Sequence, residues 1–273
     1  MNLAKLLFYD KDEILSKKFD NFLGLSGSDN YSEKVVFYYQ EMIEKYLRVK
    51  SADKKKNESI HILDIGCGKY SFITPILKEK YNCELSAMDI SEEELSSNNN
   101  VDEKIIFDAC DENYVRVLGK YKNKYDLIVT SMFLEHAVNP NITHKMIFYL
   151  LKNNGFIIHA YPTLYDPVLF MNYIMPHWLS RRFLYAVEPS RKTSGKFDTY
   201  YKCCRGFSRK VNKYYAANNA RVLEWENFYG TRYFYRIFTI QALLSVFYVI
   251  VLKLKLNLFT SASCVVLTRD SQT

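Results

Sequence analysis

Hydrophobic and polar positions follow two different patterns in the first 163 residues. Up to residue 49, apolar side chains such as Val35, Tyr39 and Ile43 recur every three to four positions, which predicts helices on either side of a Gly/Ser break. Residues 50–59 are polar and predict a surface loop. Short apolar runs then alternate with helical stretches, at 60–65, 84–90, 104–107, 126–130 and 156–160. This alternation predicts βαβ units and a parallel sheet.

Local start and stop signals refine these elements. Thr74-Pro75 predicts a helix start after the first strand, and Asn153-Asn154-Gly155 predicts a helix stop before the fifth. Ser208 is expected to cap a helix that runs to about Asn218. Further strands are expected near residues 221–225 and 264–268. The sheet would then have about seven strands in all.

The length of 273 residues and the hydrophobic share of 48% indicate a globular chain with one large core and an elaboration. We expect an α/β fold with a doubly wound, mostly parallel sheet and helices on both faces. Its parts are cover helices and a loop at 1–59, a ligand-binding core at 60–163, an aromatic and basic cover insertion after strand five at 164–207, and the completion of the sheet at 208–273.

The net charge of +7 is unevenly distributed along the chain. Residues 181–236 hold 13 Lys and Arg against 4 Asp and Glu, a local charge of +9, which leaves −2 elsewhere. Such a segment suits an anionic substrate, a lipid headgroup surface or nucleic acid, and it is equally typical of a solvated face.

The N-terminal residues, the cysteines and the most hydrophobic run bear on the cellular location of the protein. The apolar part of residues 1–9 is too short for a secretory signal, which predicts a cytoplasmic protein. The six cysteines lack metal-ligand spacing and are expected to be reduced and structural. Residues 240–258 are the most hydrophobic run, but only about 11 residues, 242–252, are uninterrupted, short of the ~20 that span a bilayer. We expect a core helix there, with peripheral membrane contact as the alternative.

A glycine turn follows the first predicted strand, in the sequence HILDIGCGKYSF from His61 to Phe72. Gly66 and Gly68 stand where a Rossmann-like fold places a phosphate or a nucleoside. A dinucleotide fingerprint would continue to a third small residue, but this chain has Lys69, Tyr70 and Ser71. The turn therefore argues against a nicotinamide cofactor without naming the ligand.

Polar or small residues end each of the first four predicted strands. Asp64 and the glycine turn end the first, Asp89-Ile90 the second, Asp108-Ala109 the third, and Ser131 the fourth. In doubly wound folds the ligand lies beyond the carboxyl ends of the strands, so these residues are expected to converge on one site. A single aspartate at such a place is usually a turn or a helix cap, whereas their joint order favours a ligand.

In these residues the chain resembles the class I S-adenosylmethionine-dependent methyltransferases, in particular the group that acts on small molecules and glycans. The matching motifs are LDIGCG at 63–68, Asp-Ile-Ser at 89–91, Asp-Ala at 108–109, Leu-Glu-His at 134–136 and Tyr-Pro-Thr at 161–163. The resemblance covers residues 60–163 well and 200–268 loosely. It implies a Rossmann-like fold and S-adenosylmethionine as the cofactor, with no metal.

The resemblance also implies cofactor-binding roles. Gly66 and Gly68 lack a Cβ and would let the backbone approach the cofactor. Asp64 would meet its amino acid end, and Asp89 would accept from both ribose hydroxyls. The remaining members of the expected set are Cys67 in the turn, Ile90 against the adenine, Asp108 at the adenine amino group, Ala109 and Ser131. Tyr70 stands where the family usually has glycine, so its ring either packs on the ligand or diverts the loop.

Methyl transfer is an in-line displacement in which positioning can supply roughly 7 to 11 kcal/mol of the barrier. For a hydroxyl acceptor a general base would add about 10² to 10⁴ in rate. His136, just beyond the fourth strand, is the candidate catalytic residue, in competition with His159 and His177. Glu135 would orient the cofactor or cap the next helix.

The acceptor is expected to contact residues 164–207, where aromatic side chains alternate with Arg and Lys. That composition suits a sugar or glycan, with or without a phosphate or lipid, and also single-stranded RNA. No DNA partner is expected, and the oligomeric state is left open. One alternative is an RNA methyltransferase, which is disfavoured because no Asn/Asp-Pro-Pro-Tyr motif follows the fourth strand. The other is a catalytically silent fold that binds a cofactor or a partner without turnover.

Overall fold

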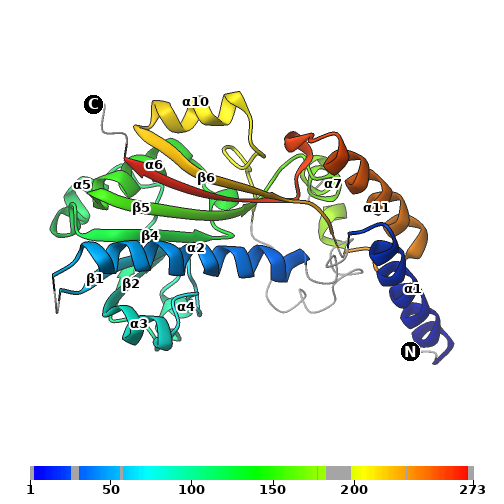
Figure 1. The fold of residues 1–273 in the computed structure, drawn as a ribbon, viewed down its shortest axis with the longest axis horizontal. Helices are drawn as coiled ribbons and strands as arrows, with labels where there is room; N and C mark the ends of the chain where they lie inside the picture. The colour runs from blue at the N-terminus through cyan, green and yellow to red at the C-terminus, as the bar shows by residue number, and fades with distance from the viewer. Residues whose placement is uncertain are drawn as a thin grey trace.

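A computed structural model describes residues 3–25, 31–55, 58–176, 178–182, 198–231 and 233–269 (Figure 1). Its centre is a seven-stranded sheet in the order β3-β2-β1-β4-β5-β7-β6. β7 is antiparallel to both of its neighbours, and the other pairs are parallel. The strands are β1 Ile60–Ile65, β2 Cys83–Asp89, β3 Glu103–Ile106, β4 Tyr125–Ser131, β5 Leu151–Pro162, β6 Ala220–Phe228 and β7 Ala262–Arg269. The predicted fold class, a mostly parallel seven-stranded sheet between helices, is confirmed.

Helices cover both faces of this sheet. Those within the described residues are α1 Leu3–Phe22, α2 Tyr31–Asp53, α3 Pro75–Tyr81, α4 Glu92–Ser96, α5 Tyr114–Val117, α6 Pro140–Leu150, α7 Pro167–Ile174, α10 Arg209–Ala217 and α11 Phe238–Lys253, with the 3-10 turns η1 Gly119–Tyr121, η2 Leu134–His136 and η3 Asn257–Phe259. α2 lies along one face of the sheet, and α6 and α10 lie on the other (Figure 1).

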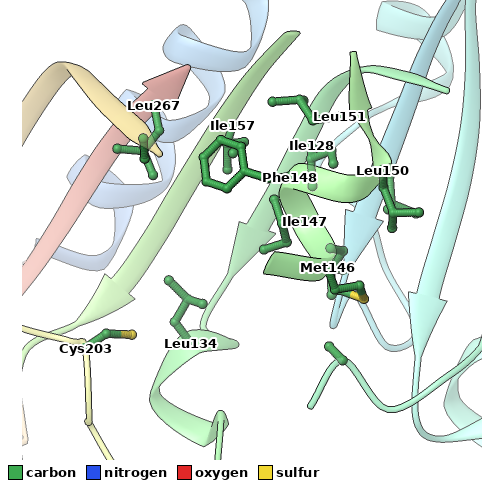
Figure 2. Packing of buried hydrophobic residues seen from close by; sticks show 14 of the residues in the cluster. Ile128, Leu134, Met146, Ile147, Phe148, Leu150, Leu151, Ile157, Cys203 and Leu267 are labelled. Carbon is green, nitrogen blue, oxygen red and sulfur yellow. The ribbon is translucent and has the colours of Figure 1, made fainter. Parts of the chain in front are cut away.

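The core forms two layers because neighbouring strand residues point to opposite faces. Ile62 packs with Tyr39 of α2, whereas Leu63 belongs to the layer of α6. Figure 2 shows Ile147 and Phe148 of α6 beside strand residues of β4 and β5. Strands that are buried on both faces read as continuous apolar runs, which is why the sequence pattern located them.

Two of the three local signals are confirmed. The Thr74 side chain accepts a hydrogen bond from the Leu77 N–H at 3.3 Å, with Pro75 as the first helical residue of α3. The Ser208 side chain accepts from the Val211 N–H at 3.3 Å at the start of α10. Both caps satisfy a backbone donor that the helix itself leaves without a partner.

The helix stop expected at residues 153–155 is wrong in position. α6 ends at Leu150, and β5 begins at Leu151. Leu151 pairs with Tyr125 and Phe156 pairs with Leu127, so β5 has residues 152–155 where β4 has only Asp126. Pairing with the buried strand β4 therefore absorbs these turn-forming residues as an irregularity inside the strand.

The polar segment 50–59 was expected to be a surface loop, but α2 continues to Asp53. Lys50 is 2% exposed, and its ammonium group donates to the Asn154 backbone carbonyl. Its charge is also 4.7 Å from the centre of the Phe156 ring. Lys50 thus anchors the end of α2 to the irregular part of β5.

α1 and α11 pack together at one end of the molecule (Figure 1). α11 is not the core helix that was expected, because Leu243 is 74% exposed and Ile250 is 50% exposed. Within the described residues, no helix is long and apolar enough to cross a membrane.

Candidate functional site

The acidic residues predicted at the strand ends lie at one edge of the sheet. β1, β2 and β3 are neighbours and parallel, so their carboxyl ends meet there. The Gly66 N–H donates to the Met88 carbonyl at 2.7 Å, and the Phe107 N–H donates to the Asp89 carbonyl at 3.0 Å. The structure therefore brings Asp64, Asp89 and Asp108 to a common edge, with Ser131 at the end of β4 beside β1.

The glycine turn has a backbone that other residues rarely adopt. Gly66 has a φ of +71° and Gly68 a φ of +53°. A Cβ on Gly66 would lie 2.5 Å from Cδ2 of Phe133, which follows β4. A Cβ on Gly68 would lie 2.8 Å from Oε2 of Glu94. Both glycines permit a backbone bend, and Gly66 also permits close packing against Phe133.

Asp89 ties the end of β2 to this turn. One of its carboxylate oxygens accepts from the Gly68 N–H at 3.0 Å, and the other accepts from the Ser91 N–H at 3.0 Å. A carboxylate has about four lone-pair sites, so two bonds leave acceptor capacity for a ligand. The same side chain can thus hold the turn and receive hydroxyl groups.

Asp64 is buried beneath the turn, 3% exposed, and accepts a hydrogen bond from the Ser71 hydroxyl at 2.6 Å. Burial raises its pKa from the usual value to about 7, and the charge of Asp89 adds to the shift. A cation beside Asp64 would favour the charged carboxylate. The sequence analysis did not identify Ser71 as the hydrogen-bond partner of Asp64, although it lies only seven residues further along the chain.

Tyr39 of α2 is a second group that sequence reasoning missed. It is 1% exposed, and no atom of the described residues makes a hydrogen bond to its hydroxyl. Burial holds the Tyr39 pKa well above its usual value, and the Asp64 carboxylate contributes to that shift. A buried hydroxyl without a partner is costly unless a ligand or water satisfies it. The sequence presented Tyr39 only as one member of a helical apolar stripe.

The other expected cofactor contacts differ in exposure. Ile90 is 69% exposed, and Ala109 is buried. Asp108 is exposed, and its carboxylate accepts from the Cys110 N–H at 2.8 Å. The Cys67 sulfur lies 3.8 Å from the Asn98 amide nitrogen, and burial raises the pKa of its thiol. The Tyr70 side chain is 84% exposed, so its ring is not packed into the protein.

The turn after β4 places Glu135 and His136 next to each other. His136 Nδ1 is 2.7 Å from the Asp198 backbone carbonyl, and its Nε2 is 3.8 Å from Glu135 Oε1. Because a carbonyl can only accept, this contact assigns the proton of a neutral ring to Nδ1 and leaves the lone pair on Nε2. Met132, at the start of this turn, has a strained φ of +52°.

Glu135 itself is 4% exposed, and burial raises its pKa to about 8. Its Oε2 has no hydrogen-bond partner among the described residues. Glu135 does not cap the next helix, since α6 begins at Pro140. Of the competing histidines, His159 is fully buried and bonded to the Thr130 hydroxyl at 2.8 Å, and His177 lies outside the described residues.

Residues 198–205, the described end of the expected cover insertion, lie against this turn. The N–H groups of Tyr200 and Tyr201 donate to the Glu135 carbonyl at 2.7 and 3.2 Å. The Lys202 ammonium donates to the Val138 carbonyl at 2.7 Å. Five of the aromatic and cationic residues expected in the insertion lie outside the described residues: Phe183, Tyr185, Arg191, Lys192 and Phe197. In the part of the chain that is described, no cluster of His, Cys, Asp and Glu could hold a metal ion.

The sheet order with only β7 reversed and the glycine turn after β1 define a Rossmann-like fold. Residues 37–239 match the methyltransferase domain family. Since this match spans most of the chain, the chain belongs to that family and is an S-adenosylmethionine-dependent methyltransferase.

Solved structures with a similar fold include a putative methyltransferase in complex with the Trm112 methyltransferase activator of Haloferax volcanii, with 12% identity, a TM-score of 0.50, and coverage of 93% of this chain and 98% of that one. A geranyl diphosphate methyltransferase in complex with GPP and sinefungin has 10% identity and a TM-score of 0.50, covering 84% and 77%. A SAM-dependent methyltransferase from Archaeoglobus fulgidus has 16% identity and a TM-score of 0.47, covering 84% and 94%. No curated protein matches the chain.

Proposed function

We propose that this methyltransferase binds S-adenosylmethionine at the carboxyl edge of β1 to β4 and methylates a hydroxyl group of a sugar, a glycan or another small acceptor. The observation that carries the cofactor site is the Asp89 carboxylate, which joins the end of β2 to the Gly68 N–H. The residues proposed around the cofactor are Asp64, Gly66, Cys67, Gly68, Asp89, Ile90, Asp108, Ala109 and Ser131.

The residues present fit the chemical groups of this cofactor. Asp64 is near enough to the unpartnered Tyr39 hydroxyl to raise its pKa, and the Asp64 carboxylate is proposed to accept from the ammonium group of the cofactor. Asp89 retains acceptor capacity for the two ribose hydroxyls. The exposed side chain of Ile90 is free to cover an apolar ring face, and the exposed Asp108 carboxylate can accept from an amino group.

The bound cofactor supplies an activated methyl group on a sulfonium, and the protein positions the acceptor in line with it. His136 is proposed to accept the proton of the acceptor hydroxyl at Nε2, because the Asp198 carbonyl holds Nδ1. Glu135 Oε1, at 3.8 Å from Nε2, is too far from that nitrogen for a hydrogen bond. In this proposal the Asp198 carbonyl orients the His136 imidazole, and the imidazole accepts the proton of the acceptor hydroxyl.

The acceptor class is proposed from the segment that packs on this turn. Tyr200 and Lys202 provide an aromatic ring and a cation in the segment that bonds to Glu135 and Val138, beside His136. Rings stack on sugars, and cations pair with phosphates, so a phosphorylated or lipid-linked glycan also fits. The similar structures were matched at 12% identity or less where the TM-score reaches 0.50, so their own acceptors say nothing about this one.

Calorimetric titration with S-adenosylmethionine tests the cofactor site. The wild-type chain is expected to bind, and Asp89→Ala is expected to weaken binding by at least about tenfold because it removes the carboxylate for the ribose and frees the turn. Asp111→Ala is the matched control, since that aspartate is partly exposed and its carboxylate bonds locally to Asn113. Equal binding by both variants would contradict the site, and no wild-type binding at millimolar ligand would favour the silent fold.

Transfer of a labelled methyl group to glycans, glycolipids and RNA tests the acceptor class. Label on a glycan or glycolipid hydroxyl is the expected result, with His136→Ala lowering kcat by about 10² to 10⁴ at unchanged cofactor affinity. Label on RNA alone would replace the glycan proposal with the RNA alternative. Full activity of His136→Ala would remove the general base from the mechanism.

A further inference from the structure

α11 buries polar side chains and exposes apolar ones, which is the reverse of a typical surface helix. Its buried side chains include the polar residues Gln241, Ser245 and Tyr248. Its exposed side chains include Leu243 at 74% and Ile250 at 50%. A helix on the surface of a water-soluble protein normally buries its apolar stripe and exposes its polar one. The exposed face of α11 is therefore suited to contact with an apolar environment.

Hydrogen bonds fix this orientation. The Ser245 hydroxyl donates to the Asp20 carboxylate of α1, and the Gln241 amide donates to the Thr231 carbonyl at 2.9 Å and to Asp20 at 3.3 Å. The Tyr248 hydroxyl donates to Asp166, the residue that caps α7. Rotating α11 to hide its leucines would break these buried bonds and leave polar groups without partners. The exposed apolar face is thus a stable feature of the fold.

We define the end surface as the exposed apolar residues of α11 and the segment after it: Ile240, Leu243, Val246, Ile250, Leu254 and Leu258. The neighbouring α7 exposes Met171 at 58% and Ile174 at 62%, and Trp178, soon after it, is 63% exposed. α1, α7 and α11 gather at the same end of the molecule (Figure 1). Apolar exposure gathered at one end of a molecule in this way marks an interaction site.

The chain segment that contains α11, residues 227–269, carries only positive charges. Residues 227–269 contain no Asp or Glu. Lys253 and Lys255 alternate with leucines at the end of α11 and are exposed, and Arg236 precedes the helix, 3.9 Å from Glu13. Exposed leucines flanked by lysines are the composition of helices that lie in the interface of anionic membranes.

The end surface also lies at the edge of the sheet that holds the candidate site. The Thr163 N–H after β5 donates to the Ser261 carbonyl before β7 at 3.1 Å, so α7 and the end of α11 both connect to the sheet there. We infer that the end surface docks on a lipid bilayer with anionic headgroups, with α11 lying in the plane of the interface. Docking would bring the carboxyl edge of the sheet close to the membrane surface.

Sedimentation with sucrose-loaded vesicles tests this inference on the full chain. Binding to phosphatidylcholine vesicles with about one third phosphatidylglycerol is expected, with weak binding to phosphatidylcholine alone and release at about 0.5 M salt. The double variant Leu243→Gln/Ile250→Gln should lower the partition coefficient by at least about tenfold, and Lys253→Gln/Lys255→Gln should remove the preference for the anionic lipid.

Val115→Gln/Val117→Gln is the matched control, because these valines of α5 are similarly exposed, at 53% and 50%, at the opposite end of the molecule (Figure 1). It should bind vesicles like the wild type. The inference is overturned if the wild type ignores anionic vesicles, if the control loses binding equally, or if the chain forms a dimer that Leu243→Gln/Ile250→Gln dissociates. Cofactor titration of each variant reports folding and is independent of vesicle binding.

Discussion

Asp64 and Glu135 are buried acids whose surroundings favour their protonated forms. Their pKa values are raised by burial to about 7 and about 8. No lysine or arginine among the described residues offsets these shifts, which distinguishes the two acids from Asp126. The pKa of Asp126 is lowered, despite burial, by the hydrogen bond from the His61 N–H and by Lys152 and Lys54. A structural ion pair explains Asp126, whereas ligand binding is the role that we propose for the site of Asp64.

These shifts predict how stability depends on pH. Between about pH 4 and 7 the folded chain holds a proton on Asp64 that the unfolded chain has released, so the free energy of unfolding falls as pH rises through that window. Asp64→Asn is expected to remove this part of the slope, and Glu135→Gln is expected to remove the part that extends to about pH 8. Urea denaturation of each variant at a series of pH values measures the slopes.

Asp111→Asn serves as the control, because the Asp111 pKa is lowered by hydrogen bonds to Asn113 and its titration falls below this window. Its slope between pH 5 and 7 should equal that of the wild type. A wild-type stability that rises over that window, with Asp64→Asn unchanged from it, would show that Asp64 is ionised when folded.

At the scale of elements, caps decide where helices begin. Ser208 caps α10, which carries Tyr215 into the core layer beside β6. Ser208→Ala is expected to lower the free energy of unfolding by about 1 kcal/mol, because the Val211 N–H loses its acceptor. Ser208→Asp should retain most of the stability, since aspartate also caps and favours the positive end of the helix dipole. Equal losses in both variants would assign the effect to packing instead of capping.

Secondary-structure elements were predicted well where the signal was local. The inner strands β1, β4 and β7 were located because burial on both faces gives continuous apolar runs. The starts of α3 and α10 were located because Thr74 and Ser208 act on their own first turns. The end of α6 was misplaced because long-range pairing of Leu151 with Tyr125 overrode the turn residues. The roles assigned to the site residues remain predictions.

On the scale of the whole molecule, Asp166 joins three distant parts. Its carboxylate accepts from the N–H groups of Val168 and Leu169 in α7 at 2.9 and 3.1 Å. It also accepts from the hydroxyls of Tyr248 in α11 and of Ser261 before β7. Burial raises its pKa, and these four bonds oppose that shift. The Asp166 side chain thereby fixes the positions of α7 and α11 relative to the sheet.

Asp166→Ala should therefore lower the free energy of unfolding by roughly 3 kcal/mol or more, because it leaves four donors without their acceptor. Tyr248→Phe removes only one donor and should cost about 1 kcal/mol. Denaturant unfolding measures both values. A loss below about 0.5 kcal/mol for Asp166→Ala would mean that other groups hold these helices.

The sequence by itself determined the strands, the glycine turn and the alignment of acids at the strand ends, because periodicity and motif order are carried by residues close together in the chain. Only the tertiary structure decided which way α11 faces, that Tyr39 lies near Asp64 and that Glu135 is buried. Because α11 has apolar residues on most sides, the spacing of its apolar residues does not indicate which side faces the protein. Asp20 and Asp166, which lie 225 and 82 positions from their α11 partners, supply that information through long-range hydrogen bonds.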